Sequence, residues 1–140
     1  MANPAYGWCK RRTDVQPLRI LYVEDNALVR EVTAELLAQE QRQIVACADA
    51  EEALKEFREN PYDILITDVS LPVMSGIDLA RSILAIRPDL PIIIASGYSL
   101  DFGLENWGGN VRAIIKPFEG PEIEALITDL VAGSEPVRGS

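Results

Sequence analysis

Residues 64–68 read Ile-Leu-Ile-Thr-Asp, a short apolar run that ends in a carboxylate. Runs of this length that are rich in β-branched residues and do not alternate in polarity are typical of strands buried on both faces. Four other runs have the same character, at residues 20–23, 44–47, 92–95 and 111–115. Helical patterns lie between them, and this alternation predicts a parallel sheet with helices on both faces.

The predicted helices have recognisable starts. Asn26 and Ser75 are placed to cap two of them, and Asp49 with Glu52 resembles a capping box at the start of another. Apolar residues recur at helical spacing in each helix, and we expect every such stripe to belong to the core. The stripe of the first helix consists of Val29, Val32, Leu36 and Leu37. Residues 98–109 are rich in glycine and poorly patterned, so we expect a short or mobile fourth helix there.

The length of 140 residues suits one domain. We assign residues 1–17 to a flexible leader, residues 18–132 to the folded domain and residues 133–140 to a disordered tail. No apolar run approaches the roughly 20 residues that a membrane span needs. The N-terminus lacks the apolar stretch of a signal peptide, so we expect a cytoplasmic protein without a membrane partner.

Charge and composition exclude several classes of function. The formal net charge is −9, which disfavours nucleic acid as a partner, and the short basic run Lys10–Arg12 is assigned to a solvated leader. Histidine is absent, which removes Ser-His-Asp and Cys-His catalysis, histidine metal sites and a phosphohistidine carrier within this chain. The two cysteines make no disulfide framework. Carboxylates, hydroxyls and lysine must therefore perform the chemistry.

Polar residues follow the predicted strands where each one ends. Glu24 and Asp25 follow the first, Asp68 the third, Ser96 the fourth and Lys116 the fifth. In open parallel sheets, ligands bind beyond the carboxyl ends of the strands, where the strand order reverses. In a flavodoxin-like doubly wound sheet of order 2-1-3-4-5, the first and third strands are neighbours at that point. We therefore expect these five side chains to share one pocket.

Three carboxylates in one pocket repel one another, since two charges 4 Å apart interact by about 4 kcal/mol at an effective dielectric constant of about 20. Either one of them is protonated or a divalent cation lies among them. A site of oxygen ligands without His or Cys suits Mg²⁺, or Mn²⁺. Lys116 and Ser96 are suited to phosphoryl oxygens, and an aspartate carboxylate such as Asp68 is a known nucleophile for phosphoryl transfer.

Taken together, these strand ends resemble the response-regulator receiver family of two-component signalling. The resemblance rests on Glu24–Asn26, Thr67–Gly76, Ala95–Tyr98 and Lys116–Phe118, in order, and it covers about residues 18–132. It implies a single regulatory domain that takes a phosphoryl group from a histidine kinase or phosphotransfer protein. It also implies an unidentified downstream partner, and no enzymatic activity beyond the protein's own phosphorylation and dephosphorylation.

The family pattern assigns roles to individual residues. Asp68 would be the phosphoacceptor and would bind Mg²⁺ together with Asp25 and the backbone carbonyl of Ser70, while Glu24 would act through a metal-bound water. The resemblance also implies that Ser96 contacts the phosphoryl group and that Lys116 pairs with it. A cis Lys116–Pro117 bond is a further implication.

One position departs from the family pattern. Typical receivers carry Tyr or Phe three residues before the lysine, and this chain has Ala113. The run Ser96-Gly97-Tyr98 resembles a subgroup without that aromatic and the C-terminal receivers of hybrid kinases. We expect residues 98–109 to change order on phosphorylation in its place.

Two other functions compete with a signalling switch. A Mg²⁺-dependent hydrolase of the haloacid-dehalogenase type also forms an aspartyl phosphate, but it carries Asp-x-Asp after its first strand, whereas this chain has Glu24-Asp25-Asn26. A receiver-like binding module that works without phosphorylation is disfavoured because every pocket residue is present. Gly76 is assigned to close helix packing or to the helix start.

Overall fold

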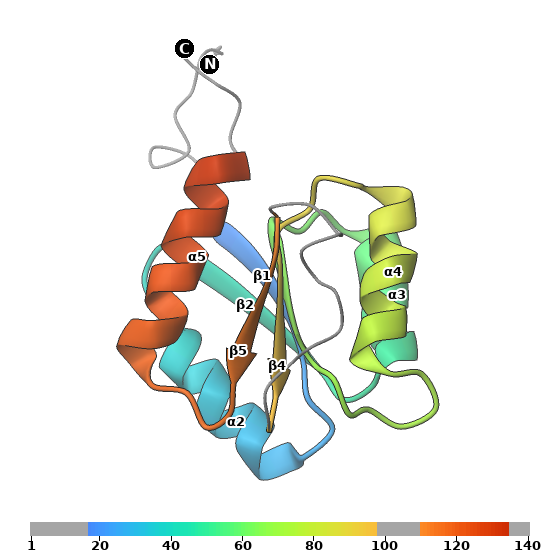
Figure 1. Ribbon diagram of the computed structural model, residues 1–140, viewed down its shortest axis with the longest axis horizontal. Helices are drawn as coiled ribbons and strands as arrows, with labels where there is room; N and C mark the ends of the chain where they lie inside the picture. The colour runs from blue at the N-terminus through green and yellow to red at the C-terminus, as the bar shows by residue number, and fades with distance from the viewer. Residues whose placement is uncertain (1–16, 98–109, 135–140) are drawn as a thin grey trace.

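The computed structural model describes residues 17–97 and 110–134. Within them lie five strands and four helices, which alternate except that no described helix separates β4 from β5 (Figure 1). The strands are β1 (Leu18–Val23), β2 (Arg42–Cys47), β3 (Ile64–Asp68), β4 (Ile92–Ser96) and β5 (Val111–Ile115). The helices are α2 (Ala27–Leu37), α3 (Ala50–Glu59), α4 (Gly76–Ile86) and α5 (Gly120–Ser134). The predictions for residues 98–109 lie outside the described residues.

All strand pairs are parallel and the order is β2-β1-β3-β4-β5, which confirms the flavodoxin-like prediction. In Figure 1, α2 and α5 cover one face of the sheet and α3 and α4 cover the other. Each face has its own apolar core, because the side chains of a strand alternate between the two faces. The register pairs Val23 of β1 with Thr67 of β3, and Asp68 with Ala95 of β4. The carboxyl ends of these three central strands are therefore level with one another.

The predicted helix caps are present. The side chains of Asn26, Asp49 and Ser75 accept hydrogen bonds from backbone N–H groups in the first turns of α2, α3 and α4. The capping box of α3 differs by one residue, because the Glu52 carboxylate accepts from the N–H of Ala48 (3.0 Å) and not from that of Asp49. These caps begin each helix close to the end of the preceding strand.

The prediction that every aliphatic stripe belongs to the core holds for only one of the four predicted residues of α2. Leu37 is fully buried in the core, whereas Val29, Val32 and Leu36 are 37%, 58% and 42% exposed, and Thr33 is buried beside Leu37. The three exposed side chains border an open pocket whose other side is lined by Pro117 and Phe118, so no element of the described chain covers them. The apolar core of this face is completed by α5, through Ile123, Ile127 and Leu130.

The last helix continues to Ser134, two residues into the segment that we assigned to the tail. Pro121 lies in its first turn, as expected from the sequence. Among residues 17–97 and 110–134, no helix combines the length and apolar character needed to cross a membrane.

Candidate functional site

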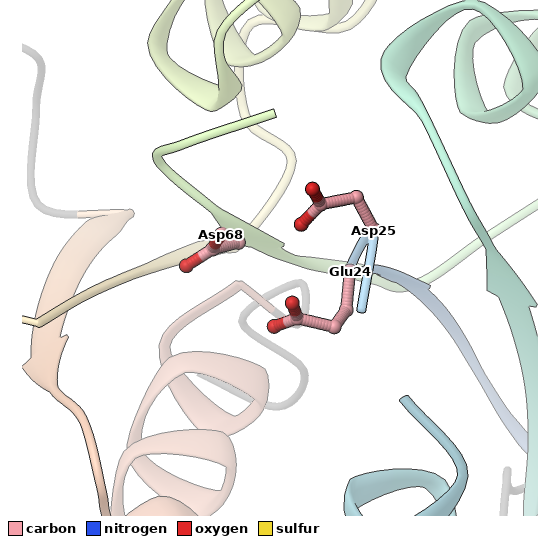
Figure 2. Close-up of side chains that lie close together, drawn as sticks. All are labelled: Glu24, Asp25 and Asp68. Carbon is pink, nitrogen blue, oxygen red and sulfur yellow. The ribbon is translucent and has the colours of Figure 1, made fainter. Parts of the chain in front are cut away.

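The carboxylates of Glu24, Asp25 and Asp68 lie together at the carboxyl edge of the sheet. Glu24 and Asp25 follow β1 directly, Asp68 is the last residue of β3, and these two strands are adjacent. One oxygen from each carboxylate lies within 4.8 Å of the others, and Figure 2 shows Glu24 and Asp25 extending from the end of β1 toward Asp68. Glu24 and Asp68 are 3% and 7% exposed, whereas Asp25 is open to solvent.

Lys116, the residue after β5, reaches into this cluster. Its Nζ donates to Asp68 Oδ1 (3.0 Å) and to Glu24 Oε1 (3.1 Å). Burial alone would lower the pKa of Lys116, but the hydrogen bonds to Asp68 and Glu24 outweigh it, so the pKa lies above its ordinary value. The ammonium is therefore charged at neutral pH. The Lys116–Pro117 bond is cis, as the family pattern implies.

The cluster has the composition of a site for a hard divalent cation. Three carboxylates and one ammonium leave two net negative charges when all four groups are ionised. The donor atoms are all oxygens, which suits Mg²⁺ or Mn²⁺. The residues present therefore fit the cation that the sequence predicts.

Backbone contacts hold the loop that carries Glu24 and Asp25. The N–H of Asn26 donates to Glu24 Oε2 (3.2 Å), and Nη1 of Arg30 donates to the carbonyl oxygen of Glu24 (2.8 Å). Arg30 therefore ties the first turn of α2 to the end of β1. The sequence analysis missed this residue, because an arginine six positions away in a helix carries no local signal for such a contact.

The loop between β3 and α4 packs closely on Asp68. Thr67 Oγ1 donates to the carbonyl oxygen of Asp68 (3.0 Å), and the N–H of Gly76 donates to the carbonyl of Val69 (2.9 Å). A Cβ at position 76 would lie 1.9 Å from the Asp68 carbonyl oxygen. Gly76 thus starts α4 and permits close packing, as predicted, and the packing is against the backbone of Asp68 itself.

The other predicted residues lie around this centre. Ser96 ends β4, is 4% exposed, and accepts at its carbonyl from the Lys116 N–H (2.6 Å). Ser70 lies two residues after Asp68 with an exposed side chain, and Ala113 lies on β5 and is also exposed. The roles that the family pattern gives to Ser70 and Ser96 stay predictions.

Comparison with known proteins identifies the family. Residues 20–128 match the response regulator receiver domain. The chain is 32% identical to the two-component response regulator PhoP of Pseudomonas aeruginosa over 125 residues, which is 84% of this chain and 53% of that protein. The chain belongs to the response regulator receiver family, and it is a phosphoacceptor regulatory domain of two-component signalling.

Solved structures support the same family. The response regulator TrrA from Thermotoga maritima, in complex with Mg²⁺-BeF, is 32% identical with a TM-score of 0.73, covering 81% of this chain and 98% of that one. The receiver domain of sensor histidine kinase PA1611 from Pseudomonas aeruginosa has magnesium in its active site cleft. It is 26% identical with a TM-score of 0.73, covering 83% of this chain and 98% of that one. The chain spans about half the length of PhoP, so the activities of such full-length relatives cannot be assigned to this chain.

Proposed function

We propose that Asp68 accepts the phosphoryl group in this receiver. The observation that carries the proposal is the ion pair between Asp68 Oδ1 and Lys116 Nζ at 3.0 Å, made inside the three-carboxylate cluster. Asp68 ends a central strand and is 7% exposed, so its position is fixed by the sheet and by the loop that follows it. A positioned carboxylate beside a permanent positive charge is suited to attack a phosphoryl group.

The transfer forms a bond between a carboxylate oxygen of Asp68 and phosphorus, while the bond from phosphorus to the donor breaks. Lys116 moves from pairing with two carboxylates to pairing with a phosphoryl oxygen, and the Ser96 hydroxyl donates to another. Asp25, Asp68 and the Ser70 carbonyl would hold Mg²⁺ directly and Glu24 would hold it through a water, and the bound cation would supply positive charge for the phosphoryl oxygens. Mn²⁺ suits the same oxygen ligands.

The donor and the downstream target follow from the family. Receiver domains of two-component systems take phosphate from histidine kinases, and for this chain we propose a phosphohistidine on a kinase or phosphotransfer protein. We further propose a cytoplasmic location, a folded domain over residues 18–132, and a protein target without nucleic acid or membrane contact. The chain acts alone or as the receiver of a hybrid kinase.

Labelling by a small phosphodonor tests the assignment of Asp68. With Mg²⁺ and acetyl phosphate, we expect a labile adduct of about 80 Da, the mass of one phosphoryl group. Asp68→Asn abolishes it, while Asp129→Asn, at an exposed aspartate of α5, keeps it. An adduct that survives in Asp68→Asn would refute the assignment. Steady turnover of p-nitrophenyl phosphate would favour the hydrolase, and we expect none.

A further inference from the structure

The helix α2 carries an apolar face that the fold leaves exposed. Leu28, Val32 and Leu36 follow one another at four-residue spacing, so they form a row along the helix, and all three are exposed. Val29 extends this row sideways and lines a pocket of about 430 Å³ together with Val32 and Leu36. These four residues are called the α2 face below. A contiguous apolar row, unlike a single exposed residue, indicates an interaction surface.

Acidic side chains border the α2 face. Glu31 and Glu35 lie three residues after Leu28 and Val32, so they form a second row on the helix surface, the acidic row. Both carboxylates are exposed, and the salt bridges of residues 17–97 and 110–134 involve neither of them. The α2 face therefore suits an occupant that combines aromatic or aliphatic side chains with positive charge.

The leader, residues 1–17, has this composition. Tyr6 and Trp8 shortly precede the run Lys10–Arg12, and the leader holds three of the chain's 13 basic residues but only one of its 22 acidic residues. A second copy of the chain that met this one through the same face is a poorer match, because it would place Glu31 and Glu35 opposite their own counterparts. Charge complementarity therefore favours the leader as the occupant.

The leader joins the fold beside the C-terminal end of α2. The N–H of Leu18, the first residue of β1, donates to the carbonyl oxygen of Gln41 (2.8 Å), which lies four residues after the end of α2. A helix of 11 residues is about 16 Å long. The ten residues of chain from Trp8 to Leu18 reach up to about 33 Å when they are extended. Trp8 can therefore reach the whole α2 face.

We propose that the leader docks on the α2 face of its own chain, with Trp8 against the apolar residues and the run Lys10–Arg12 beside the acidic row. Docking removes apolar surface of both segments from water, and the covalent tether favours it by holding the leader at high effective concentration near the face. The leader thus has a binding role in place of the solvated one assigned from its composition. A partner that uses the α2 face must first displace the leader.

Disulfide mapping in the full chain tests the docking, because Cys9 lies in the leader and the other cysteine, Cys47, is buried. Glu35→Cys places a thiol in the acidic row. Thr128→Cys is the matched control, at an exposed position of α5, the other helix on this side of the sheet. The readout is the initial rate of disulfide formation between Cys9 and the new thiol in dilute, mildly oxidised protein, followed by peptide mass spectrometry. We expect the α2 position to react at least about ten-fold faster than the α5 position.

Changes in the leader locate the contacts. Trp8→Ala lowers the ratio of the α2 rate to the α5 rate at least about five-fold, because it removes the aromatic anchor. Replacement of the run Lys10–Arg12 by three glutamines lowers the ratio about two- to five-fold, as expected for the loss of an exposed ion pair. Taking the ratio cancels any change in the reactivity of the Cys9 thiol. Asn3→Ala, a change in the leader outside both contacts, keeps the ratio of the parent leader.

Equal rates at the α2 and α5 positions overturn the inference, and so does a preference for α2 that either change in the leader leaves intact. Disulfide-linked dimers whose share rises with protein concentration assign the face to a second copy and overturn it as well. Glu31→Cys repeats the test should Glu35→Cys fold poorly. Labelling of Asp68 by acetyl phosphate is a separate measurement, so the failure of the proposed function leaves this inference standing.

Discussion

Alanine at position 76 would place a methyl group inside the backbone of the phosphoacceptor strand. Its Cβ would lie 1.9 Å from the carbonyl oxygen of Asp68, 2.8 Å from the carbonyl carbon and 3.1 Å from Thr67 Oγ1. Two of these atoms are backbone, so no side-chain rotation relieves the overlap. The end of β3 and the start of α4 must move apart by about 1.5 Å to approach ordinary contact at about 3.5 Å.

The cost of Gly76→Ala follows from that movement. Overpacking of this kind costs about 1–3 kcal/mol. The hydrogen bond from the Gly76 N–H to the Val69 carbonyl (2.9 Å) is strained or lost, which adds about 0.5–1.5 kcal/mol. Alanine favours the helix over glycine by up to about 1 kcal/mol, which offsets part of this. We therefore expect the free energy of unfolding to fall by about 0.5–4.5 kcal/mol, with a central value of about 2.5 kcal/mol, against the roughly 5–15 kcal/mol typical of a domain.

Urea denaturation of the metal-free protein measures this change, and Gly120→Ala is its matched control. Gly120 is also the first residue of a helix, but a Cβ there would lie 3.4 Å from Leu36 Cδ1, an ordinary contact. We expect the control to match the parent or to gain up to about 1 kcal/mol. Gly76→Ala should also slow labelling by acetyl phosphate, because Asp68 moves with its backbone. Equal stabilities for the two variants would refute the reasoning.

Three further predictions concern charge, pH and backbone strain. Lys116→Met leaves the buried carboxylates of Glu24 and Asp68 without their cation, so in the absence of metal its free energy of unfolding should be about 2–3 kcal/mol lower than that of the parent protein. Saturating Mg²⁺ should reduce this difference between variant and parent. The control Lys55→Met removes an exposed lysine, and its free energy of unfolding should stay within about 0.5 kcal/mol of the parent value. Burial raises the pKa of Cys47 from 9.0 to about 12, so the unfolded chain loses the thiol proton above pH 9 while the folded protein keeps it. The stability that the buried neutral thiol contributes is therefore complete below pH 9 and is lost above it, at up to about 1.4 kcal/mol per pH unit. Between pH 8 and pH 10.5 the free energy of unfolding should fall less for Cys47→Ala than for the parent protein, and an equal fall in both would contradict this. Val73 has φ 67° and is 95% exposed, so Val73→Gly should raise the free energy of unfolding by about 0.5–1 kcal/mol by denaturation; a decrease would show that the valine makes a contact that stabilises the fold.

Much of the site could be predicted from the sequence because most of its functional residues end or directly follow a predicted strand. In a parallel sheet, all carboxyl ends lie at one edge, so strand order alone brings Glu24, Asp25, Asp68 and Lys116 together. Helix starts could be predicted for a similar reason, since a cap such as Asn26 accepts a hydrogen bond from an N–H group only three residues away.

Contacts between elements could not be read in this way. Arg30 binds the Glu24 carbonyl only because of the angle at which α2 leaves β1. The strand order places Lys116 near the carboxylates, but only the packed structure shows that its ammonium contacts Asp68 and Glu24 at the same time. Local sequence contains neither contact. The pocket beside Asp68 depends on the same arrangement, because its lining residues come from both ends of the described chain, from Tyr22 to Phe118.

By itself, the sequence determined the alternating strands and helices and the carboxylates, serine and lysine at the strand ends, because periodicity and strand ends are local properties. Only the tertiary structure decided which side of α2 is buried. Val29, Val32 and Leu36 have the spacing of a core face, yet they stay exposed because they border an open pocket with Pro117 and Phe118 on its other side. Whether another element covers a helix face depends on how the whole chain packs, and no single segment encodes it.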